Sequence, residues 1–230
     1  WTVIKHLGPR HLGGHGFSAE GDDYNAKSAV VLATDSRLGQ VAVKVIRSPD
    51  EKTRTRFLRE MAFLQRVRHP NIVPCLDGPF ASPDQTLMIG VVEMLHGGSL
   101  VQVRERVEGG RLGEELVIQM AIDVLSGLQW AHEKGVVHCD LKCANIMSIS
   151  EQEGDGFKIV DFGIAHMEES HYRDVSGTML TQSRAHASTK GTSHYMSPEQ
   201  LKKDKVGFPS DMWSMGIIMY RNLTGRFPFG

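Results

Sequence analysis

Short apolar runs separated by turn residues dominate the first half of the chain, and this pattern predicts β-strands. Ala29–Thr34 and Val41–Ile46 are rich in β-branched residues, and Asp35–Gln40 lies between them with the composition of a hairpin turn. Ile72–Cys75 and Thr86–Glu93 are two further candidate strands. We therefore expect a small antiparallel sheet in this part of the chain.

A different spacing interrupts these runs. Within the charged segment Pro49–Arg68, the apolar residues Phe57, Met61 and Leu64 recur at intervals of four and three. This is the spacing of one face of an α-helix. We expect one helix here, stopped by Pro70.

The second half of the chain is mainly helical in its pattern. Glu114–Lys134 predicts a long amphipathic helix, and Gly135 follows it as a C-terminal cap. Its expected buried stripe is Ile118, Ile122, Leu125 and Leu128. Asp211–Leu223 predicts a second helix, buried on several sides. The apolar residues on which this expectation rests are Trp213, Met215, Ile217, Ile218 and Tyr220.

Between these helices the chain predicts short strands and one long loop. The expected strands are Val136–His138, Ile146–Ser148 and Lys158–Val160, and Ser170–Lys190 is a polar segment with no apolar period. Strands first and helices second predict an α+β fold of two lobes. We assign residues 1–93 to an N-terminal lobe with one helix, 94–98 to a hinge that ends at Gly97–Gly98, and 99–230 to a mainly helical C-terminal lobe.

Composition narrows the function classes. The 230 residues include 26 Lys and Arg and 27 Asp and Glu, a formal net charge of −1, which gives no support for nucleic-acid binding. We find neither a signal peptide nor an apolar stretch long enough to span a membrane. The 3 cysteines include no CxxC pair, and the scattered histidines show no metal-ligand spacing. We expect a cytoplasmic protein, and Trp1 in place of Met predicts a piece of a longer one.

Two charged residues, Lys44 and Glu60, lie at positions where an ion pair between them could hold phosphate groups. Lys44 lies on a predicted strand between apolar neighbours, where a lysine is costly to bury unless it is paired. Glu60 lies on the following helix and is its expected partner. Each residue alone is more often an ordinary surface charge.

Two further groups come after predicted strands. His138–Asn145 places a carboxylate (Asp140), an ammonium (Lys142) and an amide (Asn145) within six residues. Asp161 follows the strand next to it and begins the sequence Asp-Phe-Gly. Carboxylate and amide oxygens suit a hard cation such as Mg²⁺.

Together these segments resemble the signature set of the protein kinases: V-A-I-K, H-R-D-L-x-x-x-N, D-F-G and A-P-E. Val41–Lys44, His138–Asn145 and Asp161–Gly163 carry the first three, and Gly191–Glu199 is similar to the peptide-positioning segment, with S-P-E in place of A-P-E. Ser210–Gly216 is similar to the opening of the family's central helix, and Thr224–Phe229 is similar to the segment just after that helix. The resemblance runs from about Ala29 to the last residue.

The resemblance implies a serine/threonine protein kinase that uses ATP and Mg²⁺, with Asp140 orienting the acceptor hydroxyl and Lys142 stabilising the moving phosphoryl group. Lys142 and Thr192 favour Ser/Thr acceptors on a protein substrate over Tyr. Asn145 and Asp161 would hold the metal, and Lys44, braced by Glu60, the phosphates. Other implied contacts with ATP are Val30, Ala42, Met147, the Glu93 carbonyl, the Leu95 amide, and Ser99 near the ribose, with Val92 as gatekeeper. Phe162, His138 and Leu64 would stack in an apolar spine, and Asp211 would brace the catalytic loop.

The chain departs from the family in four places. The glycine loop aligns either with Asp22–Val30, where no glycine survives, or with Leu12–Ser18 and an insertion after it. Cys139 replaces the Arg that usually pairs with a phosphorylated loop residue, so we expect less dependence on such phosphorylation. The segment Ser170–Lys190 is a predicted insertion.

The fourth departure is that the chain stops at Gly230, before helices that the family normally adds. We expect marginal stability from this, and a Glu199 without its usual Arg partner. The resemblance leaves room for regulatory domains elsewhere in the parent protein. The alternative function is a pseudokinase scaffold, which the degenerate glycine loop favours. It is disfavoured by the joint presence of five residues: Lys44, Glu60, Asp140, Asn145 and Asp161.

Overall fold

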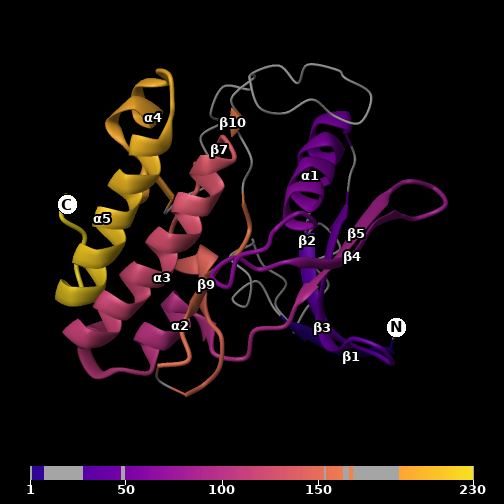
Figure 1. Ribbon diagram of the computed structural model, residues 1–230, viewed down its shortest axis with the longest axis horizontal. Coiled ribbons are helices and arrows are strands. Elements are labelled where there is room, and N and C mark those ends of the chain that lie inside the picture. The colour runs from indigo at the N-terminus through magenta and orange to yellow at the C-terminus, as the bar shows by residue number, and fades with distance from the viewer. Residues whose placement is uncertain are drawn as a thin grey trace, which may run out of the picture.

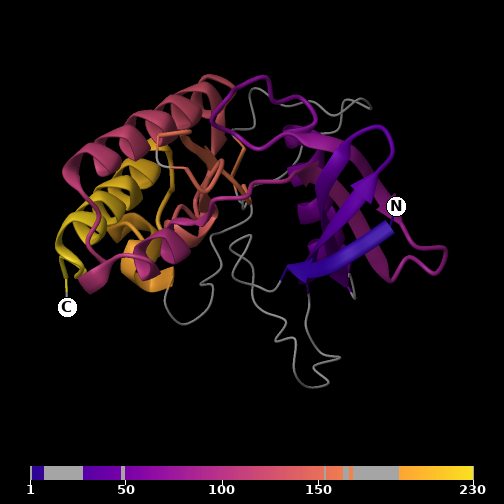
Figure 2. The ribbon, with the colours of Figure 1, turned by 90° about the horizontal axis from the view of Figure 1, so that it is seen from below.

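The computed structural model describes residues 2–7, 28–47, 50–152, 154–162, 166–167 and 192–229. They form two lobes, a β-sheet with one long helix and a mainly helical part, as expected (Figure 1; Figure 2). In chain order the elements are β1 (Thr2–Leu7), β2 (Ser28–Asp35), β3 (Gly39–Arg47), α1 (Glu51–Leu64), β4 (Cys75–Ala81), β5 (Leu87–Glu93), β6 (Gly98–Ser99), α2 (Leu100–Glu105), η1 (Glu108–Gly110), α3 (Glu114–Glu133), β7 (Val136–Val137), η2 (Cys143–Asn145), β8 (Ile146–Ser148), β9 (Phe157–Ile159), β10 (His166–Met167), η3 (Thr192–Tyr195), α4 (Pro198–Lys202) and α5 (Phe208–Thr224).

The N-terminal lobe is built on a five-stranded antiparallel sheet with the order β1-β2-β3-β5-β4. Helix α1 begins at the N-cap Asp50, whose side chain accepts a hydrogen bond from the Thr53 N–H, and it packs its apolar face on the sheet. Gly90 in β5 makes this close packing possible, because a Cβ there would lie 2.3 Å from the Met61 Sδ. The helix thereby comes close enough to place Glu60 beside the strand that carries Lys44.

Helices α3 and α5 form the framework of the C-terminal lobe. One buried apolar cluster continues from Phe57 and Met61 of α1, through Ile72, to Val124 of α3 and Ile218 of α5. Because the core is shared, the two lobes are packed against each other rather than merely linked by the chain.

Segment 71–73, after α1, is hydrogen-bonded to β9 of the C-terminal lobe. The Ile159 N–H of β9 donates to the Asn71 carbonyl at 2.8 Å, and the Val73 N–H donates to the Ile159 carbonyl at 3.0 Å. Gly127 of α3 faces the same segment, with a hypothetical Cβ only 3.0 Å from the Asn71 oxygen and 3.2 Å from the Ile72 Cγ1. A side chain at Gly127 would force these neighbouring atoms to shift by a few tenths of an ångström.

The same segment corrects one predicted strand. Ile72–Cys75 was expected to be extended in the sheet, but Ile72 makes only an isolated bridge with Ile159, and the strand β4 begins at Cys75. The run is apolar because it is buried between the lobes. Pro74, which has no N–H, also suits a position outside the strand.

Two helix faces also differ from the prediction. In α3, Ile118 and Ile122 are 48% and 58% exposed. The buried face consists instead of Val117, Met120, Ala121, Val124, Gly127, Leu128 and Ala131. Helix α3 is apolar on more than one side, so spacing alone did not identify the face that packs on the core.

Helix α5 is buried on fewer sides than expected. Met215, Ile217 and Ile218 are buried, but Trp213 and Tyr220 remain 36% and 44% exposed. Other boundaries also shifted: α1 ends at Leu64, well before Pro70. The elements β1, β4, α2 and α4 had no clear sequence signal. No helix in the described ranges combines the length and the apolar character needed to cross a membrane.

We expect Gly127→Ala and Gly216→Ala to have opposite effects on the free energy of unfolding. Both remove a helical glycine, which favours the helix by about 1 kcal/mol. Gly216 is exposed and a Cβ there meets nothing within 4 Å, whereas at Gly127 the new atom crowds backbone, and overpacking costs about 1–3 kcal/mol. Urea unfolding should show Gly216→Ala more stable and Gly127→Ala less stable than the unaltered chain; equal stabilisation would contradict the close packing of α3 on Asn71.

Candidate active site

Lys44 is one of the residues that form an ion pair between the two lobes. Its strand β3 lies between β2 and β5 in the sheet, and its Nζ lies 2.7 and 2.9 Å from the Glu60 carboxylate oxygens of α1. The same Nζ lies 2.5 Å from Asp161 Oδ1, beyond the end of β9 in the other lobe. The expected Lys44–Glu60 pair is therefore present, and Asp161 joins it.

Charge sharing sets the protonation of these three groups. Burial by itself would lower the pKa of Lys44, but the neighbouring Asp161 and Glu60 carboxylates outweigh it and raise that pKa. Burial raises the pKa of Asp161, yet the Lys44 ammonium prevails and lowers it to about 2. Burial raises the pKa of Glu60 to about 7 in spite of Lys44, and Asp161 adds to the increase. One ammonium thus serves two carboxylates, and Asp161 is the more strongly ionised of them.

A second cluster lies in the loop after β7. Lys142 Nζ lies 2.8 Å from Asp140 Oδ2, and Asn145 Nδ2 donates to the Asp140 carbonyl at 2.8 Å. The Asn145 carbonyl in turn accepts from the Val160 N–H at 2.9 Å. These bonds hold Asp140, Lys142 and Asn145 together, next to the strand end that carries Asp161.

Two buried oxygen atoms in this cluster, Asp140 Oδ1 and Asn145 Oδ1, lack a hydrogen-bond partner among the described residues. An unpaired buried oxygen is costly and is commonly satisfied by a ligand or an ion. Asn145 Oδ1 and the Asp161 carboxylate are the hard oxygen donors that Mg²⁺ prefers, so the residues fit such an ion. Within the described ranges, no group of three or more His, Cys, Asp or Glu side chains forms a different metal site.

Asp211 fixes the loop from below, as expected. It is fully buried at the start of α5, and its two oxygens accept from the His138 N–H at 2.8 Å and the Cys139 N–H at 2.9 Å. His132 Nε2 of α3 lies 2.8 Å from the same carboxylate. Cys139 is held in the left-handed region with φ of 63°, and these bonds account for how a non-glycine residue is kept there.

Two members of the predicted apolar spine, His138 and Phe162, are in contact. The rings of His138 and Phe162 are 4.7 Å apart between centroids, and Phe63 packs on Phe162 at 4.8 Å. Leu64 is buried in the same cluster. Burial lowers the pKa of His138, which suits a neutral ring in this apolar stack.

The residues expected around a nucleotide base line the junction of the lobes. Ala42, Met147 and Leu95 are almost fully buried, and Val30 packs against the same cluster. No hydrogen bond from the Leu95 N–H is found within the described residues. The Ser99 hydroxyl caps α2 by accepting from the Gln102 N–H at 3.4 Å, so its side chain already has a structural use.

Several expectations concern residues outside the described ranges. Both alignments of the glycine loop, Leu12–Ser18 and the Asp22–Asn25 part of Asp22–Val30, lie there, as do Gly163, Gly191 and Ser170–Lys190. Cys139 and Glu199 are described. Burial raises the pKa of the Cys139 thiol, so it stays neutral, and Glu199 accepts a short hydrogen bond from the Ser210 hydroxyl.

Sequence reasoning missed three side chains near the loop and the lobe junction. His132 bonds Asp211, and Gln200 Nε2 donates to the Cys139 carbonyl at 2.7 Å. Lys158 Nζ forms an ion pair with Glu93 Oε2 at 2.6 Å. None of the three carried a recognisable signal, because each pairs with a residue more than sixty positions away.

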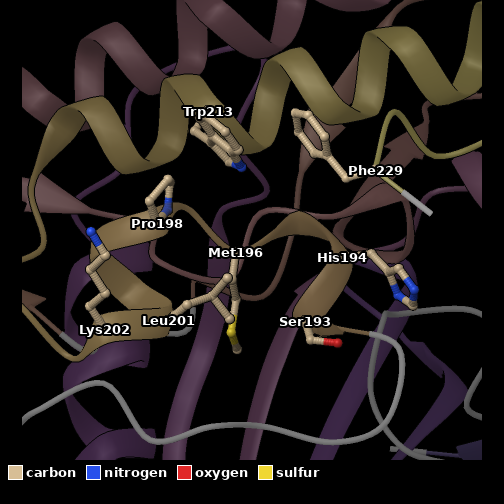
Figure 3. A pocket seen from close by; sticks show the side chains of 8 residues that line it. All are labelled: Ser193, His194, Met196, Pro198, Leu201, Lys202, Trp213 and Phe229. Atoms are coloured by element: carbon tan, nitrogen blue, oxygen red, sulfur yellow. The ribbon is translucent and has the colours of Figure 1, made fainter.

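A separate hollow of about 450 Å³ lies between η3, α4 and α5 (Figure 3). Its walls are Ser193, His194, Met196, Pro198, Leu201, Lys202, Trp213 and Phe229. The Trp213 and Phe229 rings stack at 5.6 Å between centroids. None of the predicted catalytic or metal-binding residues lines this hollow.

Removing Lys44 should cost more stability than removing the charge of Glu60. Lys44→Met leaves the buried Glu60 and the partly buried Asp161 without the ammonium that they share, and breaking a largely buried pair in this way costs about 3 kcal/mol, whereas Glu60→Gln keeps the Lys44–Asp161 pair. In Lys44→Met the pKa of both carboxyl groups in the folded protein rises above their pKa in the unfolded chain. The folded state therefore binds more protons than the unfolded state, and the loss of stability relative to the unaltered protein becomes smaller as the pH falls from 8 to 5. Urea unfolding at both pH values measures this; a deficit independent of pH would contradict the shared-charge arrangement.

Comparisons with known proteins agree with this geometry. The sequence profile of the family described as Protein kinase domain matches residues 26–230. A probable serine/threonine-protein kinase of Streptomyces coelicolor is 36% identical over 227 residues, which cover 96% of this chain and 32% of the relative. Human serine/threonine-protein kinase D2 is 38% identical over 194 residues, 82% of this chain and 20% of the relative.

A third relative, serine/threonine-protein kinase PknB of Mycobacterium tuberculosis, is 35% identical over 227 residues, 96% of this chain and 34% of that protein. The chain thus spans about a third or less of the length of these curated relatives.

Proposed function

The chain belongs to the protein kinase domain family, and on that premise we propose that it transfers the γ-phosphate of ATP to Ser or Thr hydroxyls of a protein substrate. The observation that carries the proposal is the meeting of Lys44, Glu60 and Asp161 across the lobes, beside an Asp140 oxygen that has no partner within the described residues. Members of this family use ATP and Mg²⁺. Nothing in the described residues favours the pseudokinase alternative.

Each side chain has a role that follows from its position. Asp140 Oδ1 accepts the hydrogen of the acceptor hydroxyl and aims its oxygen, which is the work of a positioned general base. Lys142, held 2.8 Å from the other Asp140 oxygen, stabilises charge on the phosphoryl group as it moves. Lys44 binds the non-transferred phosphates, and Glu60 fixes its position.

The nucleotide would lie at the junction of the lobes. Val30, Ala42 and Met147 provide an apolar sandwich for the adenine, the Glu93 carbonyl and the Leu95 N–H its hydrogen bonds, and Ser99 the neighbourhood of the ribose. Asn145 and Asp161 would hold Mg²⁺, which neutralises phosphate charge when bound. The segment 192–199 would support the substrate peptide.

Replacing Asp140 by Asn should abolish transfer. We expect radiolabelled phosphate from ATP and Mg²⁺ to appear on Ser or Thr of a generic basic protein, and Asp140→Asn to lower the rate by about 100-fold or more. Asp204→Asn is the matched control, because Asp204 is exposed and its side chain lies outside the site. Absence of transfer by the folded unaltered protein, or equal rates in both variants, would sink the proposal.

The activity should depend little on phosphorylation of the segment before Gly191. The neutral Cys139 cannot form the charge-assisted pair with a phosphate that an Arg would make. We expect phosphatase-treated protein to keep its transfer rate, and alanine variants of Ser176, Thr178, Thr181, Ser183, Ser188 and Thr189 to do so too. Loss of activity in either experiment would contradict this.

A further inference from the structure

Lys158 and Glu93 form an ion pair that joins the end of the N-terminal sheet to the C-terminal lobe. Lys158 Nζ lies 2.6 Å from Glu93 Oε2, and the two side chains are 13% and 32% exposed. Glu93 is the last residue of β5, and Lys158 is the middle residue of β9. The pair is partly shielded from water, so salt screens it less than a surface pair.

The surroundings make this pair a fixed point for the connection between the lobes. Lys158 is paired with Met147 in the β8–β9 ladder, and β8 pairs with β6, where the connection ends. The Glu93 N–H donates to the Pro74 carbonyl at 3.3 Å, and the His96 N–H donates to the Ile149 carbonyl at 3.0 Å. The chain after Glu93 is thus attached to the C-terminal lobe at His96 and at β6.

The same short stretch of β9 and its extension carries both ion pairs that cross the lobes in the described residues. Lys158 binds Glu93, and three residues later Asp161 binds Lys44. On the proposed function, Lys44 and Asp161 lie at the phosphate end of the nucleotide and Glu93 at the adenine end. One short strand and the residues that follow it therefore form an ion pair with the N-terminal lobe at each end of the proposed nucleotide site.

We propose that Lys158 is a positioning residue for nucleotide binding, which acts by holding Glu93, and with it the backbone groups of residues 93–95, at the distance from β8 that the adenine requires. This inference rests on the proposed function. Lys158 itself does not contact the nucleotide, so its effect passes entirely through the Glu93 carboxylate.

The test measures the affinity for a fluorescent ADP analogue in four proteins: the unaltered chain, Lys158→Met, Glu93→Gln and the double variant. Met keeps most of the length of the Lys stem, and Gln keeps the Glu93 backbone carbonyl. Each single variant should raise the dissociation constant about threefold to fivefold, the range of a partly exposed pair. The double variant should be no worse than either single one, because only one interaction is lost.

Two further variants separate positioning from loss of fold. Lys158→Arg should restore the affinity, and Lys205→Met, an exposed lysine, should leave it unchanged. In transfer assays Lys158→Met should raise KM for ATP with kcat little changed, and the difference should shrink at high salt. A lower melting temperature with unchanged nucleotide affinity, or additive effects of Lys158→Met and Glu93→Gln, would overturn the inference.

The outcomes also distinguish this inference from the proposed function. An unaltered protein that binds the analogue but transfers no phosphate refutes the transferase, while the affinity cycle still decides the role of Lys158. An unaltered protein that binds no nucleotide overturns both.

Discussion

One largely buried ammonium between two carboxylates is the constraint on which the site depends. Lys44 would be costly to bury alone, and it can be buried because α1 brings Glu60 to it from one side and the end of β9 brings Asp161 from the other. The position of α1 over the sheet, the packing of Met61 on Gly90 and the contact of the two lobes all serve this one arrangement. A helix displaced by one turn would take Glu60 away from Lys44 and leave the ammonium with Asp161 as its carboxylate partner among the described residues.

Asp211 has the corresponding role for the catalytic loop. A carboxylate that is fully buried must be satisfied by donors, and the donors here are two consecutive backbone N–H groups of the loop and the ring of His132. The loop therefore takes the shape that Asp211 requires, including the left-handed Cys139. Asp140 and Lys142 gain their orientation from a residue that never approaches the substrate.

The sequence predicted many of the features that depend on nearby residues and missed several that depend on residues distant along the chain. Strands β2, β3 and β5, the helices α1, α3 and α5, and the pairing of Lys44 with Glu60 followed from local pattern and family resemblance. The buried face of α3 did not follow, because Ile118 and Val117 are both apolar and the face that is buried depends on tertiary packing, such as that of Gly127 on Asn71. Ile72 was given to a strand for the same reason: its apolar character reflects burial between the lobes, which a local pattern cannot distinguish from burial in a sheet.

The missed pairs show where such reasoning ends and what the fold adds. Glu93 was expected for its backbone carbonyl alone, and Lys158 for strand formation alone, yet their side chains form an ion pair across 65 positions of sequence. Lys158 of β9 pairs with Glu93, and Asp161, which follows β9, pairs with Lys44. The backbone of β9 is hydrogen-bonded to Asn71 and Val73. A single three-residue strand can do this because side chains, backbone groups and the residue after its end each reach a different neighbour. Charge compensation at both ends of the site is then set by the position of this strand, and a shift of β9 by one residue would break the Lys44 and Glu93 pairs together.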